Sequence, residues 1–338
     1  MSERRDLAAA FLDRAGWGAA LRRHLAGDAS DRSYERLFMN GQTAVLMDAP
    51  PGKGDDPADF VAIAAHLRGL GLSAPEVLAE DLGNGFLLLE DLDDDLFVRC
   101  IGADPALEVA LTVAAAEVLA HLQGAPAPAG LPDLSAADWA EAAGFAPDWY
   151  GLAATGVKAD RRAFTAELGE LLTAHADGPR VLILRDYHAE NLLWLPRRNG
   201  LARVGLLDFQ LAQMGQPGYD LVSLVQDARR DVGAAASEAA VRRFVDLTGV
   251  ADAAFRRALA VLGAQRALRI LGIFARLCLV AGKPGYLAYL PRVWGHLRQN
   301  LSHPALTSLA GLCDAILPPP TPQIVDRIRQ QCPTSPVR

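Results

Sequence analysis

Cysteines and uninterrupted apolar runs are both scarce in this sequence. The four cysteines show no CxxC spacing, which excludes a typical zinc site or disulfide framework and predicts reduced, mainly structural thiols at Cys100, Cys278, Cys313 and Cys332. The longest apolar helix candidate, Ala258–Gly282, contains Gln265 and three arginines, which the centre of a bilayer would penalise. We therefore expect a buried core helix there, and no membrane span.

Lysine is also rare, because only Lys53, Lys158 and Lys283 occur in the chain. The formal net charge is −7, and no stretch rich in lysine and arginine is interleaved with aromatic residues. Binding to nucleic acid is therefore not expected. Residues 1–17 mix acids and bases and lack a basic end followed by an apolar run, which predicts a cytoplasmic protein without an export signal.

The chain is long enough for more than one hydrophobic core. Its 338 residues are 51% hydrophobic and 22% charged, the balance of a globular protein, and this length predicts two packed lobes.

The first part of the chain predicts a small sheet. After two short amphipathic helices, Gly27–Asp48 has the pattern of a β-hairpin with Asn40-Gly41 as its turn. A helix over 56–69 follows, with Asp56 as N-cap and Pro57 at its first position. Two further strands are predicted around 76–80 and 86–90.

The rest of the chain is predicted to be mostly helical. Short strands are predicted at "VLIL" before Asp186 and at "NLLWL" after it, and a third, in "VGLLDF", ends at Asp208. Asp220 is the expected N-cap of the next helix. The tail over 318–338 is rich in proline, and we expect only partial order there.

Asp186, Asn191 and Asp208-Phe209 form the most informative pattern. Asn191 follows Asp186 by five positions and precedes Asp208 by seventeen, which is the spacing of phosphotransfer sites of the kinase type. Any one of these aspartates alone is better explained as a turn or capping residue. Together and in order, they predict Asp186 as the catalytic base that takes the acceptor's proton. Asn191 and Asp208 then supply oxygen ligands to Mg²⁺.

Seven blocks of sequence resemble the aminoglycoside phosphotransferase and choline kinase family: "LAGDASDRSYERL", "LMDAPP", "GFLLLEDL", "DWY", "RDYHAENLL", "GLLDFQLA" and "YDLVSLVQDAR". The resemblance implies an α+β, two-lobed fold like that of protein kinases, with a small β-rich N-lobe and a larger, mainly helical C-lobe. It implies an N-lobe over 1–90, a C-lobe over 91–317 and a tail over 318–338.

The resemblance also implies roles for individual residues. A turn would cover the phosphates of ATP, and its residues are Gly27, Asp28, Ala29 and Ser30. The backbone of the inter-lobe hinge, at Glu90 and Leu92, would bind the adenine. ATP and Mg²⁺ are the expected cofactors.

Two positions depart from the kinase pattern. Leu184 stands where a histidine usually precedes the catalytic loop, and Met47 aligns with the usual lysine of the third strand. The predicted helix over 56–69 also has no glutamate to pair with such a lysine. A replacement would have to be Lys53, an arginine such as Arg32 or Arg36, or metal alone; we favour Arg32 or Lys53.

The candidate acceptor-binding residues are His188, Trp149, Tyr150, Gln210 and Asp227. For His188, a structural role as a donor in the loop is slightly preferred to contact with the acceptor. The two aromatic residues could equally belong to the core. Gln210 and Asp227 are included through the resemblance alone.

Within the family, the blocks are most similar to enzymes that phosphorylate the anomeric hydroxyl of N-acetylmuramate or N-acetylglucosamine in cell-wall recycling. The resemblance therefore implies an ATP-dependent sugar kinase, acting as a monomer on a small-molecule acceptor. Two alternatives remain: a kinase of another small alcohol, such as choline or an aminoglycoside, and a catalytically silent nucleotide-binding module.

Overall fold

The computed structural model describes residues 2–27 and 32–333. The chain forms two compact units, each built from two segments. Met1–Gly130 and Leu184–Gln213 make the first unit, and Leu131–Ile183 and Met214–Arg338 make the second. The small antiparallel sheet and the many helices confirm the expected α+β class. The lobe limits at 90 and 317 remain predictions, since these units group segments by packing.

An antiparallel sheet is the centre of the first unit. Among the described residues it has five strands in the order β1-β2-β3-β5-β4. Their bounds are β1 (Leu21–Gly27), β2 (Ser33–Met39), β3 (Gln42–Asp48), β4 (Val77–Asp81) and β5 (Phe86–Glu90). Asn40 and Gly41 join β2 to β3 with φ of 51° and 76°, as a tight turn of the expected kind requires. The hairpin prediction is confirmed.

Strand β1 corrects the expectation of a second helix before Gly27. Leu21–Gly27 pairs antiparallel with β2, from Leu21 opposite Phe38 to Gly27 opposite Ser33. The hydrogen bonds to β2 outweigh the local helical pattern, because a seven-residue helix is weak in isolation and a sheet edge offers unpaired backbone groups.

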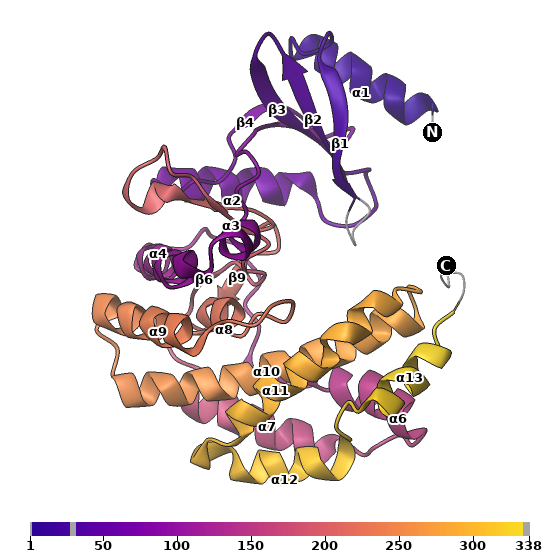
Figure 1. Cartoon of the computed structure of the whole chain (residues 1–338), viewed down its shortest axis with the longest axis vertical. Coiled ribbons are helices and arrows are strands. Elements are labelled where there is room, and N and C mark those ends of the chain that lie inside the picture. Colours follow the sequence, from indigo (N-terminus) through magenta and orange to yellow (C-terminus); the bar gives the residue numbers. More distant parts are fainter. Residues whose placement is uncertain (1, 28–31, 334–338) are drawn as a thin grey trace. The chain divides into compact units, whose positions relative to one another are not determined.

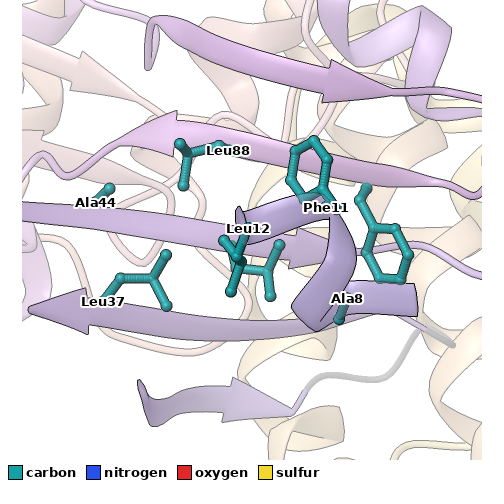
Figure 2. Packing of buried hydrophobic residues seen from close by; sticks show 8 residues of the cluster. Ala8, Phe11, Leu12, Leu37, Ala44 and Leu88 are labelled. Atoms are coloured by element: carbon teal, nitrogen blue, oxygen red, sulfur yellow. The ribbon is translucent and has the colours of Figure 1, made fainter. Parts of the chain in front are cut away.

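Helix α1 (Ser2–Arg14) covers one face of this sheet (Figure 1). Figure 2 shows its Ala8, Phe11 and Leu12 facing Leu37 and Leu88 of the strands. The rings of Phe11 and Phe86 stack with their centroids 5.8 Å apart. Burial of this cluster attaches the helix to the sheet, and the ion pair of Arg4 with Asp48 adds a polar contact.

Helix α2 (Pro57–Gly69) begins as predicted. The side chain of Asp56 accepts a hydrogen bond from the backbone N of Ala58 at 2.9 Å, and Pro57 occupies the first turn. The ring of Phe60 stacks on that of Phe209, with centroids 4.8 Å apart. This contact places the start of α2 beside the residue that follows Asp208.

Two helices and two short strands follow in the first unit. They are α3 (Phe97–Ala103), α4 (Glu108–Gln123), β7 (Leu192–Trp194) and β8 (Val204–Leu206). Strands β7 and β8 form an antiparallel hairpin, with Asn191 just before β7 and Asp208 shortly after β8, so both residues lie at its open end. The two strands were predicted, whereas α3 was not.

The second unit is mainly helical. Its elements are α5 (Ala136–Ala143), a π-helical turn (Ala146–Gly151), α6 (Leu152–Thr155), α7 (Arg162–His175), β6 (Val181–Ile183), β9 (Gln213–Gly215), α8 (Tyr219–Val225), α9 (Ala234–Thr248), α10 (Asp252–Leu279), α11 (Leu290–Leu301), α12 (Thr307–Ile316) and α13 (Pro322–Gln330). Helix α10 is its longest, and α11 packs along it (Figure 1).

Among the described residues, two helices are long and apolar enough to cross a membrane by length and composition, Pro105–Gln123 and Asp252–Leu279. In the second, 72% of the most apolar window is buried within the chain. This confirms the expectation of a core helix at α10.

Two local expectations for the second unit need correction. Asp220 is not an N-cap, because Gly218 takes that position and Asp220 lies fully buried in the first turn of α8. In the tail, α13 is a helix that the sequence did not predict. Thr321 caps it, and Val325 and Ile328 are buried, so tertiary packing stabilises a segment whose prolines suggested partial order.

His296, on α11, makes the stability of the second unit depend on pH. Burial, together with the positive charges of Arg266 and Arg292, lowers the pKa of His296 from 6.5 to about 4, while the charge of Asp231 opposes this shift. The unfolded chain therefore binds a proton more readily, and stability is lost as the pH falls from 6.5 towards 4. The melting temperature of the wild type should therefore fall between pH 7 and pH 5. We expect His296→Asn to make this fall smaller by roughly a few degrees. Thermal denaturation at pH 7 and pH 5 measures it. An equal effect of His24→Asn, at an exposed position of β1, would contradict the assignment.

Candidate active site

The loop that carries Asp186 is closed by Asn191. The side-chain Nδ2 of Asn191 donates to the carbonyl oxygen of Asp186 at 2.9 Å, and its backbone N donates to the carbonyl oxygen of His188 at 2.8 Å. Arg185, just before Asp186, has a φ of 72°, which is rare for a residue other than glycine. The Asp186 side chain is exposed, so a closed loop presents a carboxylate at its surface.

Asp208 lies beside Asn191. Its Oδ2 is 3.5 Å from Nδ2 of Asn191, and its Oδ1 accepts from Nε2 of Gln210 at 3.0 Å and from Nη2 of Arg32 at 3.2 Å. Asp208 has a φ of 56°, a second left-handed residue at this site. Strained backbone of this kind often accompanies functional sites.

The side chains of Asn191 and Asp208 fit a magnesium ion. No group of three or more His, Cys, Asp or Glu side chains suited to a metal occurs within residues 2–27 and 32–333. Mg²⁺ needs no such cage, because it commonly takes one or two protein oxygens and completes its octahedron with water and phosphate oxygens. The Asp208 side chain is 34% exposed, so an ion can reach it.

A pocket of about 280 Å³ lies next to these residues, wholly within the first unit. Its lining includes Asn191 and Asp208. Apolar side chains form much of the remainder, namely Leu25, Val45, Leu89, Leu92, Leu193 and Leu207. A flat aromatic base would find apolar contacts here, beside the polar and charged groups that also line the pocket.

Glu90 and Leu92, the predicted hinge residues, both line this pocket. The Glu90 carboxylate is already engaged, by Arg198 at 2.5 Å and by Arg68 at 3.3 Å. Its side chain thus holds the end of β5, and its backbone N donates to the carbonyl oxygen of Glu76 at 2.8 Å. The carbonyl oxygen of Glu90 and the backbone of Leu92 are therefore the candidates for contact with a base.

The predicted phosphate-covering turn is only partly described. Gly27 is the last residue of β1. Asp28, Ala29 and Ser30 lie outside the described residues, so their assignment remains a prediction.

The structure separates the candidates for the missing lysine. Arg32 is 8% exposed and lies against Asp208, whereas the side chain of Lys53 is exposed. Arg36 is held at the hinge, with Nε 2.9 Å from Asp91 and Nη1 2.5 Å from Asp94. The hydrogen bond from Arg36 also lowers the pKa of Asp94.

Leu184 and Met47 are both buried, at 3% and 0% exposure. Each therefore contributes to packing where kinases usually have a polar side chain.

The acceptor candidates divide between the two units. His188 and Gln210 belong to the first unit and are 3% and 6% exposed. Trp149, Tyr150 and Asp227 belong to the second unit.

In the second unit, the structure favours a core role for Tyr150, the alternative left open above. It is fully buried, and its hydroxyl donates to the carbonyl oxygen of Pro318 at 2.7 Å. Trp149 is partly exposed, with the guanidinium of Arg276 5.7 Å from its ring centroid. Asp227 is 1% exposed, and its Oδ2 has no hydrogen-bond partner in the described part of the chain.

Sequence reasoning missed Asp55. Its Oδ2 is 3.3 Å from Nε2 of Gln210 and 3.5 Å from Nη2 of Arg32, so Asp55 shares both partners with Asp208. The signal was available in "DDP": one aspartate, Asp56, caps α2, and a second carboxylate beside it has no local role.

Comparison with proteins of known sequence gives matches over most of the chain. The model of the phosphotransferase enzyme family matches residues 22–259. An N-acetylmuramate/N-acetylglucosamine kinase of Caulobacter vibrioides is 38% identical, with 94% of this chain and 98% of that protein covered.

Solved structures show the fold. The choline kinase LicA from Streptococcus pneumoniae superposes with a TM-score of 0.60 at 14% identity, covering 90% of this chain and 99% of that one. A ternary complex of the aminoglycoside phosphotransferase APH(2")-IIa with streptomycin and ATP has a TM-score of 0.54 at 14% identity, covering 80% and 90%. The expectation of a fold like that of protein kinases is confirmed.

The family model spans well over half of the chain, and the similarity to the Caulobacter kinase extends over nearly all of it. The chain therefore belongs to the phosphotransferase enzyme family.

Proposed function

We propose that this enzyme transfers the γ-phosphoryl group of ATP to the anomeric hydroxyl of N-acetylmuramate or N-acetylglucosamine. One observation carries the proposal. The Asn191 side chain contacts both the carboxylate of Asp208 and the main-chain carbonyl of Asp186, and these residues lie beside a pocket in the same unit. The name of the 38% identical relative supports the choice of acceptor.

In the proposed reaction, the anomeric oxygen forms a bond to the γ-phosphorus. The bond from that phosphorus to the oxygen bridging it to the β-phosphorus breaks, and the acceptor's proton passes to a carboxylate oxygen of Asp186. The products are ADP and a sugar 1-phosphate. An anomeric hydroxyl is more acidic than other sugar hydroxyls, so Asp186 needs only to orient it and accept the proton late.

Asn191 and Asp208 are the proposed ligands of Mg²⁺. The ion, when bound, neutralises charge on the phosphates and aligns them for transfer. Asn191 has a second task, because its Nδ2 holds the carbonyl of Asp186 and so keeps the base in place. The backbone of Glu90 and Leu92 would bind the adenine edge, and Gly27 would let the backbone at the start of the turn approach the phosphates.

Gln210 is the acceptor contact in the first unit that the geometry supports best. Its Nε2 donates to Asp55 and Asp208, while its Oε1 is buried with no hydrogen-bond partner in the described part of the chain. A buried acceptor without a donor is costly, and a hydroxyl or amide N–H of the sugar would satisfy it. His188, Trp149 and Asp227 remain proposed acceptor contacts, as do the monomeric state, the cytoplasmic location and the role in cell-wall recycling.

Phosphorus NMR of the product tests this proposal. Purified enzyme with Mg²⁺ and ATP is offered N-acetylmuramate, N-acetylglucosamine, choline or an aminoglycoside in separate reactions. We expect a product from the amino sugars whose phosphorus couples to the anomeric proton. A 6-phosphate would overturn the choice of hydroxyl, and activity on choline or the aminoglycoside alone would overturn the acceptor class. Bound ATP with no turnover on any acceptor would favour a silent nucleotide-binding module.

A further inference from the structure

Arg32 is a buried cation between two carboxylates. Its Nη2 lies 3.2 Å from Oδ1 of Asp208 and 3.5 Å from Oδ2 of Asp55, and the side chain is 8% exposed. Gln210 bridges the same two carboxylates from its Nε2, at 3.0 and 3.3 Å. Burying a guanidinium is costly unless it is paired, so this group of four side chains is arranged to keep a positive charge at Asp208.

The position of Asp55 depends on α2. Asp55 directly precedes Asp56, the N-cap, and the stacking of Phe60 on Phe209 ties the first turn of α2 to the residue after Asp208. The start of α2 and the end of β8 are therefore held together by a packed ring pair as well as by charge. Asp55 meets Arg32 here, although the helix itself supplies no glutamate for an ion pair.

The other two cations considered for this role, Arg36 and Lys53, are less well placed to bind the phosphates. Met47 is fully buried on β3, so this strand brings no charge at that position. Arg36 is bound by Asp91 and Asp94 at the hinge, and the Lys53 side chain is exposed.

We infer that Arg32 is the cation that binds the phosphates of ATP, and that Asp55 is a positioning residue that holds it for this task. The pair Arg32–Asp55 thus replaces a lysine on β3 paired with a glutamate within α2. The inference rests on the proposed function in that it takes ATP as the phosphoryl donor.

The same geometry implies a change of partner. Arg32 and a metal ion both require Asp208, and two cations on one carboxylate repel each other. When the nucleotide binds, its phosphates offer Arg32 a new anionic partner, which frees Asp208 for Mg²⁺ while Asp55 retains its contact with Arg32. Nucleotide and Mg²⁺ should therefore each increase the affinity for the other, and Arg32 is part of the coupling.

Calorimetric titration with adenosine, ADP and ATP, each with and without Mg²⁺, tests the inference without any acceptor sugar. Arg32→Met removes the charge and keeps much of the side-chain length. We expect it to weaken binding of Mg²⁺-ATP by about 10- to 100-fold, the loss typical of a charge-assisted hydrogen bond, and to leave adenosine binding unchanged. Arg32→Lys should recover part of the affinity. The control Lys53→Met should change the affinity for neither ATP nor adenosine.

Asp55→Asn tests the positioning role. This substitution should weaken the binding of ATP, by less than Arg32→Met does, and should leave the binding of adenosine unchanged. The double variant should bind ATP no more weakly than Arg32→Met alone, because Asp55 acts through Arg32. Equal losses for adenosine and ATP in Arg32→Met, or a large loss in Lys53→Met, would overturn the inference. Failure of the wild-type enzyme to bind ATP would overturn the proposed function as well. A wild-type product other than a sugar 1-phosphate would overturn only the proposed function.

Discussion

Asp186→Asn is expected to lower kcat by about 100-fold or more while the Kd of ATP changes little. The amide keeps the shape of the side chain but cannot accept the acceptor's proton. The hydrogen bond from Asn191 goes to the main-chain carbonyl of Asp186, so the loop should remain closed in the variant. Steady-state kinetics with N-acetylglucosamine and titration with ATP together measure the two quantities.

Asp246→Asn is a matched control for this substitution, because it removes a carboxylate from the exposed face of α9, outside the proposed site. It should leave kcat unchanged. Turnover close to wild type in Asp186→Asn would remove the base assignment. A parallel loss of ATP affinity would point to a disturbed loop and would not support a missing proton acceptor.

Asp208→Ala is expected to abolish the effect of Mg²⁺ on ATP binding, because the ion loses its anionic protein ligand. Calorimetry with excess Mg²⁺ and with a chelator measures this effect as a difference between two affinities. Metal-free ATP binding should persist, since Arg32 keeps Asp55 as its partner and stays available to the phosphates.

A second substitution separates charge from backbone strain at this position. Asp208 has a φ of 56°, where asparagine is tolerated far better than alanine. Asp208→Asn should therefore lose the response to Mg²⁺ with little change in melting temperature. Asp208→Ala should lose the response to Mg²⁺ and should also have a lower melting temperature. If Mg²⁺ still strengthened ATP binding in Asp208→Asn to the wild-type extent, Asp208 would not be the proposed ligand.

The sequence by itself determined the elements whose signals are local. The turn at Asn40-Gly41 needs positive φ values that these two residue types adopt, and Asp56-Pro57 starts α2 through a cap and a preset φ. The proximity of Asp186, Asn191 and Asp208 followed from the sequence for the same reason, because one loop and one short hairpin suffice to bring them together.

Only the tertiary structure decided where distant residues pair. Strand β1 had a helical pattern, and its state depended on backbone groups that β2 offered. From the sequence, Tyr150 could have contacted an acceptor. The structure shows that its hydroxyl donates a hydrogen bond to the carbonyl oxygen of Pro318, 168 positions away. Arg32 and Asp208 are separated by 176 positions, and Asp55 joins them only because α2 packs on Phe209. The partner of a charged side chain cannot be read from its local sequence, because the packing of the two elements that carry the charges decides which side chains come together.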